Sequence, residues 1–239
     1  MSNPKNPKIF KPMTQKKSLQ FLLLGLLWLL FSIPVITCGA ATCAVFYIAF
    51  KILNDEEPLN IFKLFLKGIK ENFVQGLLMS IISAVTIGGA GFFIWWILTE
   101  SERGIILILL ALAAVIVVLV INIFTYPMIG RYENTFGNML RNTVALSFTY
   151  GRQTLRLTGF VAAALGIEGA LFRLNPIAGF ISLLFWPTVI FYIISSFMAW
   201  IFYKVENPIK YDENGDPVDE SQDAQNETEN QNENKEIES

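Results

Sequence analysis

The sequence predicts an all-α polytopic membrane helix bundle of five to six segments, with amphipathic interfacial helices and a disordered acidic C-terminal tail. Of the 239 residues, 53% are hydrophobic and the mean hydropathy is +0.48, which is more apolar than a soluble domain of this size usually is. Several apolar runs reach the roughly 20 residues that cross ~30 Å of hydrocarbon. Residues 1–205 contain 16 Lys and Arg against 8 Asp and Glu, whereas residues 206–239 contain 2 against 12.

These features divide the chain into three regions. Residues 1–18 form a basic N-terminus that we expect in the cytoplasm, and residues 19–204 form the membrane helical domain. Residues 205–239 form an acidic cytoplasmic tail with almost no large apolar residue after Val218. Such a tail cannot bury enough surface to offset the entropy of ordering, so we expect it to be disordered.

Four apolar runs in the later part of the chain are predicted membrane helices, and the third of them is short for a crossing. Lys and Arg are concentrated in the two long connections, 51–72 and 131–156, whereas 99–104 and 173–176 are short with one Arg each. Because basic loops stay in the cytoplasm, the long connections and the C-terminus are expected inside. The four runs cover about residues 74–98, 104–128, 157–172 and 177–203.

The first apolar stretch, residues 20–50, allows two arrangements. A single kinked span would place the lysines of residues 1–18 outside, against the usual distribution of basic flanks. A hairpin that turns at "PVITCGA" (34–40) keeps both basic flanks inside, although arms of about 15 residues give only ~22 Å of helix each. A helix break is expected there because Pro34 removes a backbone donor and Gly39 loosens the chain. We favour a short or re-entrant hairpin over the kinked span.

Two segments are amphipathic at helical spacing, and each precedes a pair of apolar runs. Residues 61–75 have an apolar side opposite three lysines, which predicts an interfacial helix in contact with anionic headgroups. Residues 135–156 repeat the pattern more weakly. The acidic residues of "NDEEP" (54–58) are expected to cap the first of these helices. Its apolar side contains Phe62, Phe65, Ile69 and Phe73, and its charged side contains Lys63, Lys67, Lys70 and Glu71.

Glu168 is an acid inside an expected span, which makes it a candidate intramembrane polar site together with Arg173 and Asn122. The alternative is that Glu168 lies near the outer end of its helix and pairs with Arg173 or reaches water. The candidate partner or lipid contacts are basic and acidic residues at the inner ends of helices, although a solvated basic loop explains them equally well. They are Lys63, Lys67, Lys70, Arg131, Glu133 and Arg141.

The chemistry available for catalysis is sparse. There is no His, and the two cysteines, Cys38 and Cys43, do not share a helix face, so we interpret both as small buried hydrophobic residues. The sequence therefore predicts no catalytic residue, no metal site and no cofactor, and we do not expect an enzyme.

The stretch "LLWLLFSIPVITCGAATCAVFYIAFKILNDEE" resembles the signature of the YesL-like family of bacterial integral membrane proteins, a domain of unknown function. The matching residues are Trp28 to Leu30, Ser32 to Pro34, Thr37 to Ala40, and Tyr47. "FKLFLKGIKENFVQG" and "YPMIGRYENTFGNMLRNTVALS" also resemble later blocks of the family, so the resemblance covers roughly residues 20–204. The N-terminus departs from the family pattern, and the acidic tail is an addition to it.

The resemblance implies a multi-pass protein of the bacterial cell membrane, often encoded near carbohydrate ABC-transporter components, without established catalytic residues. We therefore expect an accessory or regulatory component associated with carbohydrate uptake. Its partners would be the lipid bilayer and a sugar ABC-transporter permease or another membrane complex, with no nucleic acid. The alternative is a stand-alone small-solute transporter or channel, with Glu168 and the broken segment 33–40 lining its path.

Overall fold

The computed structural model describes residues 14–56, 60–100 and 104–207. Within these ranges the chain is helical and has no strand, which confirms the predicted all-α fold class. The predicted cytoplasmic N-terminus (1–18) and disordered cytoplasmic tail (205–239) lie mostly outside the described residues, in 1–13 and 208–239. Residues 15–18 and 205–206, which these predictions include, belong to helices.

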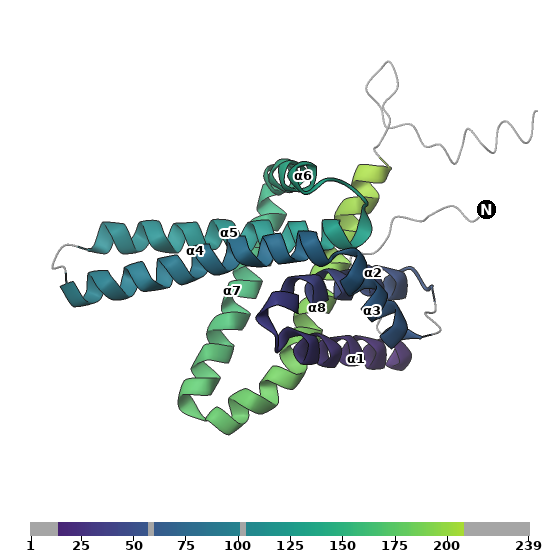
Figure 1. Cartoon of the computed structure of the whole chain (residues 1–239), viewed down its shortest axis with the longest axis horizontal. Helices are drawn as coiled ribbons and strands as arrows, with labels where there is room; N and C mark the ends of the chain where they lie inside the picture. Colours follow the sequence, from purple (N-terminus) through teal and green to yellow (C-terminus); the bar gives the residue numbers. More distant parts are fainter. Residues whose placement is uncertain (1–13, 57–59, 101–103, 208–239) are drawn as a thin grey trace, which may run out of the picture. The chain divides into compact units, whose positions relative to one another are not determined.

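Eight α-helices and one short 3-10 helix form in the described ranges (Figure 1). The chain divides into two compact units, one from Phe10 to Met198 and one that contains the described residues from Ala199 onward, so α8 contributes residues to both. The helices are α1 (Gln15–Ser32), η1 (Val35–Thr37), α2 (Cys38–Leu53), α3 (Ile61–Glu71), α4 (Phe73–Glu100), α5 (Ile105–Arg131), α6 (Phe136–Thr149), α7 (Gly151–Leu174) and α8 (Pro176–Glu206).

Five helical stretches of the described part of the chain are long and apolar enough to cross a membrane, so the chain is a multi-pass membrane protein. All four later runs predicted from the sequence are among them. The third run, which the sequence predicts as short, belongs to a helix of 24 residues, and this length corresponds to about 36 Å. The five stretches are Val35–Leu53, Phe73–Thr99, Ile105–Arg131, Gly151–Leu174 and Pro176–Glu206.

The N-terminal stretch forms the favoured hairpin and not a single kinked span. Helices α1 and α2 pack against each other, and Trp28 Nε1 donates a hydrogen bond to Thr42 Oγ1 at 2.9 Å. The end of a helix leaves carbonyl groups without a helical partner. Here the Thr37 hydroxyl is bonded to two carbonyl oxygens at the turn, those of Phe31 and, at 2.8 Å, Pro34.

Helix α2 is largely enclosed by its neighbours in the unit from Phe10 to Met198. It contacts α1, α3, α4 and α5, and 12 of its 16 residues are buried. Glycines permit this close approach: a Cβ added to Gly39 would collide with the carbonyl oxygen of Gly76 in α4. A Cβ on Gly130 in α5 would lie 2.8 Å from the Cys43 carbonyl oxygen. The helix break therefore lies at Pro34, whereas Gly39 is inside α2 and makes a packing contact.

Helix α3 is amphipathic as predicted, but its apolar side is divided between two environments. Phe65 is fully buried, with its ring centroid 5.5 Å from that of Phe31. Phe62 and Leu66, on the neighbouring edge, are 50% and 40% exposed. One edge of α3 thus packs on the first hairpin, and the other edge is left open beside the lysines.

The sequence prediction of an acidic cap for α3 is wrong. The N-cap is Asn60, whose side-chain oxygen accepts a hydrogen bond from the Lys63 backbone N–H at 3.0 Å. An Asn side chain satisfies the free N–H groups of a first helical turn as well as Asp does. Phe73, which the sequence analysis places on the same apolar side, begins α4 instead.

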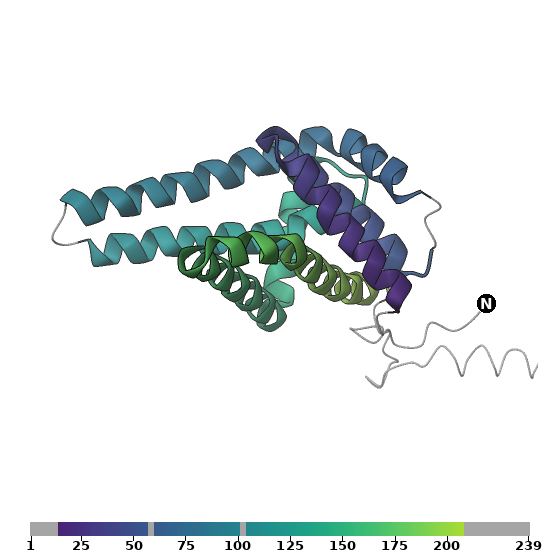
Figure 2. The same cartoon turned by 90° about the horizontal axis from the view of Figure 1, so that it is seen from below.

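Helices α4 and α5 lie side by side along their length, as Figures 1 and 2 both show. Polar contacts link the two helices. Ser83 Oγ donates to Asn122 Oδ1 at 2.9 Å, and the hydroxyls of Ser80 and Tyr126 are 3.5 Å apart. Helix α5 is in turn joined to α6, where the buried hydroxyls of Thr125 and Thr143 are 2.9 Å apart.

Candidate functional site

The buried acid Glu168 lies on α7, six residues before its last residue, and faces α8. Ser182 Oγ lies 2.9 Å and 2.8 Å from the two carboxylate oxygens, and 2.9 Å from the Gly179 carbonyl oxygen of its own helix. Close by, Trp186 Nε1 donates to the Ala164 carbonyl oxygen at 3.1 Å, so the same two helices are joined one turn further along. The carboxylate is thus enclosed between α7 and α8 and has a hydroxyl partner.

The two residues grouped with Glu168 from the sequence make different contacts. Arg173 is exposed, and within the described residues it forms no ion pair with Glu168. Asn122 is bonded to Ser83 across the α4 and α5 interface. The structure therefore gives Glu168 a serine partner and not the Arg173 pairing that the alternative allowed, and each of the three residues has its own surroundings.

Helix α3 carries Lys63, Lys67 and Lys70 outside the buried edge that packs on the first hairpin. Lys67 also lies 3.6 Å from Glu71, one helical turn away. The three ammonium groups adjoin the exposed apolar edge of α3, and this combination suits the interface between acyl chains and anionic headgroups. The prediction that these lysines contact lipid or a partner stays a prediction.

The remaining predicted contacts are distributed over two places. Arg131 is the last residue of α5, and its guanidinium carbon lies 5.6 Å from the ring centroid of Phe50. Glu133 is exposed in the connection that follows, and Arg141 is exposed on α6. Arg131 is thus part of the packed end of α5, whereas Glu133 and Arg141 lie on the surface.

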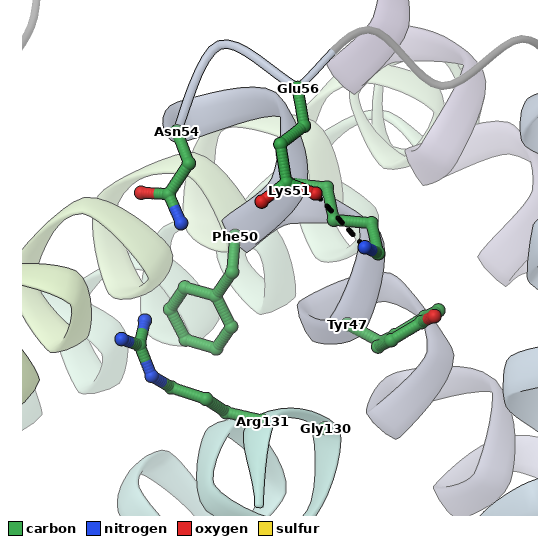
Figure 3. Close-up of a pocket in the computed structure, with 7 residues that line it drawn as sticks. All are labelled: Tyr47, Phe50, Lys51, Asn54, Glu56, Gly130 and Arg131. Atoms are coloured by element: carbon green, nitrogen blue, oxygen red, sulfur yellow. Dashed lines mark hydrogen bonds and ion pairs between the residues drawn. The ribbon is translucent and has the colours of Figure 1, made fainter.

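Where α2 and α5 meet at their C-terminal ends, the surface is hollowed into a pocket of about 200 Å³ (Figure 3). Besides Arg131, the pocket contains a second cation, Lys51, which lies 5.4 Å from the centroid of the Tyr47 ring and 3.0 Å from the Glu56 carboxylate. The lining residues are Tyr47, Phe50, Lys51, Asn54, Glu56, Gly130 and Arg131.

The sequence analysis did not identify Lys51, Asn54 or Ser182 as site residues. Lys51 and Arg131 are far apart in the sequence, but each occupies the last turn of an apolar helix before a basic connection. That shared position is the signal that links them. For Ser182 the chain offers no comparable signal, because a hydroxyl inside an apolar helix usually bonds to its own backbone.

The cysteines and acids of the described residues give no metal centre. Both cysteines are free, Cys43 buried and Cys38 half-buried. No group of three or more His, Cys, Asp and Glu among the described residues is placed to hold a metal ion.

The comparison with known proteins concerns the N-terminal part of the membrane domain. No curated protein and no solved structure matches the chain. Residues 21–95 match the model of the family described as "Protein of unknown function, DUF624". The matched segment contains most of the first hairpin, α3 and most of α4. DUF624 is the domain of the YesL-like family, so this match confirms the resemblance over residues 21–95.

Proposed function

We propose that the chain is a non-catalytic accessory or regulatory component of the bacterial cell membrane, which packs laterally against another membrane complex. The observation that supports this role is a difference between two sets of glycines. Gly39, Gly76 and Gly130 allow backbone contacts between α2, α4 and α5. In contrast, a Cβ added at Gly88, Gly89 or Gly91 of α4 would have no heavy atom within 4 Å.

Helix α7 has the same feature. Gly159, Gly166 and Gly169 are exposed, and a Cβ added to any of them would also meet nothing within 4 Å. Small residues in membrane helices let backbones approach closely. The glycines between α2, α4 and α5 are used in this way, and the exposed glycines of α4 and α7 offer equivalent contacts to a helix of another protein.

The partner that we propose is the permease of a carbohydrate ABC transporter. This choice depends on the resemblance to the YesL-like family, which the match over residues 21–95 supports. We also propose that the C-terminus is cytoplasmic. Both connections rich in Lys and Arg would then be inside, as the positive-inside rule expects.

Affinity purification in mild detergent from cells with native expression, followed by mass spectrometry, tests this proposal. We expect a permease to be recovered in stoichiometric amount with the wild-type chain and to be lost with Gly89→Leu. The matched control is Val85→Leu, on the same helix, where the native side chain is 69% exposed and already apolar. Recovery of the chain alone, or equal partner recovery with Gly89→Leu, would contradict the accessory role.

Glu168 supports a second candidate, a stand-alone small-solute transporter. A buried acid in a membrane helix is costly and is commonly functional, and Glu168 lies between two helices with Ser182 as its partner. Purified protein in proteoliposomes would then conduct solute without any partner, and Glu168→Gln would abolish that flux. Flux that is absent, or that is unchanged in Glu168→Gln, removes this candidate.

A further inference from the structure

The pocket between the ends of α2 and α5 is rich in hydrogen-bond donors. An ammonium group, a guanidinium group and a carboxamide supply donors from Lys51, Arg131 and Asn54. Among the described lining residues the carboxylate is that of Glu56, which is bonded to Lys51 at 3.0 Å. The formal charge of these described residues is therefore positive, which suits an anion.

The cations are held in position by their surroundings. The Arg131 guanidinium lies 5.6 Å from the ring centroids of Phe50 and Tyr132. Gly130, beside it, has no room for a side chain against α2, so the end of α5 is fixed at that helix. A planar guanidinium that is already oriented loses little entropy when it binds a phosphate or carboxylate.

The donors enter the pocket from two sides. In Figure 3 the Asn54 carboxamide and the Arg131 guanidinium point toward the same space beside the Phe50 ring, and Lys51 and Glu56 lie beyond that ring. An anion between Asn54 and Arg131 would accept hydrogen bonds from both. Lys51, in the same lining, would add its positive charge.

Size and position define the class of anion. Sites for drug-sized ligands occupy about 300–1,000 Å³, and this pocket has about 200 Å³, which suits a phosphate group with a short ester. Pockets with basic residues at the cytoplasmic ends of membrane helices bind acidic headgroups. We propose that this pocket binds a phosphate-ester anion, presented by an anionic phospholipid headgroup or by a soluble phosphate ester. The proposal does not depend on the accessory role.

Two measurements on the purified full-length protein distinguish the sources. Native mass spectrometry compares retention of phosphatidylglycerol with that of phosphatidylcholine, and thermal unfolding follows stabilisation by glycerol 3-phosphate. Retention of one phosphatidylglycerol in preference to phosphatidylcholine identifies a lipid headgroup. Stabilisation by glycerol 3-phosphate alone identifies a soluble ester. The absence of both effects overturns the proposal.

Substitutions that remove a positive charge and one that removes a negative charge test whether these residues bind the anion. Because charge-assisted hydrogen bonds are the strong ones, we expect Lys51→Gln and Arg131→Gln each to weaken binding of the detected anion about tenfold. Glu56→Gln removes the competing carboxylate and should strengthen binding severalfold, which a purely structural role of Glu56 does not predict. If Arg131→Gln does not fold, the half-buried Lys51 and the exposed Glu56 still test the site.

The matched control is Arg152→Gln, which removes an exposed cation of α7 outside the pocket lining. We expect this variant to bind the anion as the wild type does. An equal loss of anion binding in Arg152→Gln would indicate attraction by the overall charge of the protein and would overturn the proposed binding site. Unchanged binding in Lys51→Gln, or unchanged or weaker binding in Glu56→Gln, would overturn it as well.

Discussion

Lys17, in the first turn of α1, forms an ion pair with Asp55, two residues beyond the end of α2. Asp55 is 63% exposed and Lys17 16%. Because ion pairs at a protein surface contribute only about 0–1 kcal/mol, the significance of this pair is geometric. It shows that the chain enters and leaves the first hairpin at the same end. Asp55 has a φ of 62°, in the left-handed region that often ends helices. The first turn of α1 and the residues that follow α2 therefore lie together.

This geometry predicts that positions 17 and 55 face the same side of the membrane. We expect Lys17→Cys and Asp55→Cys to resist an impermeant maleimide in intact cells and to react after permeabilisation. Ser101→Cys, in the short connection predicted to be outside, should react in intact cells and serves as the control. Labelling of position 17 but not position 55 in intact cells would contradict the hairpin.

A second prediction concerns the closest helix contact. A methyl group at Gly39 would collide with the Gly76 backbone, which cannot move aside as a flexible side chain could. We expect Gly39→Ala to lower the free energy of unfolding by about 3 kcal/mol, at the upper end of typical overpacking costs. The measurement is thermal unfolding of the protein purified in detergent.

The control for this prediction is Gly88→Ala, on the open part of α4, where an added Cβ meets nothing within 4 Å. Alanine is the better helix former by about 1 kcal/mol, so this variant should be at least as stable as the wild type. Equal destabilisation by the two substitutions would show that the contact at Gly39 is not specific.

Much of this fold can be predicted because the signals are local or depend on charge. Apolar length locates the later membrane helices, and the basic residues on both flanks of residues 20–50 favour the hairpin. The role of Gly39 cannot be predicted, because glycine is compatible with both a helix break and a close contact. The contact with Gly76 decides between them, and it depends on how α2 and α4 are packed.

A third prediction concerns the arms of the first hairpin, which Trp28 and Thr42 connect. A side-chain hydrogen bond contributes about 0.5–1.5 kcal/mol, and a double-mutant cycle isolates that contribution. We expect Trp28→Phe and Thr42→Val to show a coupling energy of about 1 kcal/mol in detergent unfolding. Thr42 also bonds to the Cys38 carbonyl, so its single variant should cost more than the coupling alone. Additive effects of the two substitutions would contradict the bond.

A fourth prediction separates structure from transport at Glu168. Ser182→Ala removes the hydroxyl partner of a buried carboxylate, and we expect it to cost about 1–3 kcal/mol of unfolding free energy. The control is Ser147→Ala on α6. Its hydroxyl donates to the carbonyl oxygen three residues earlier, a contact that Ser182 also makes, but it has no acid partner among the described residues, so the substitution should be close to neutral. A neutral Ser182→Ala would show that the contact with Glu168 does not contribute to stability.

The candidate site is less predictable than the fold. The apolar run around Glu168 indicates its place inside a membrane helix, but its partner depends on the rotation of α7 and α8 about their axes. Arg173 is the nearer opposite charge in the sequence, yet Ser182 faces the carboxylate. The pocket combines Lys51 and Arg131 from two helices, and only the packing of α2 on α5 through Gly130 brings them together.

The enclosure of α2 has a consequence for how the protein is made. Its neighbours α4 and α5 follow it in the chain, and Gly130, which contacts it, lies at the far end of α5. A newly synthesised first hairpin therefore reaches the bilayer with its small and polar residues still uncovered. Completion of this part of the fold must wait until the end of α5 has left the ribosome, and an insertion chaperone would have its greatest effect during that interval.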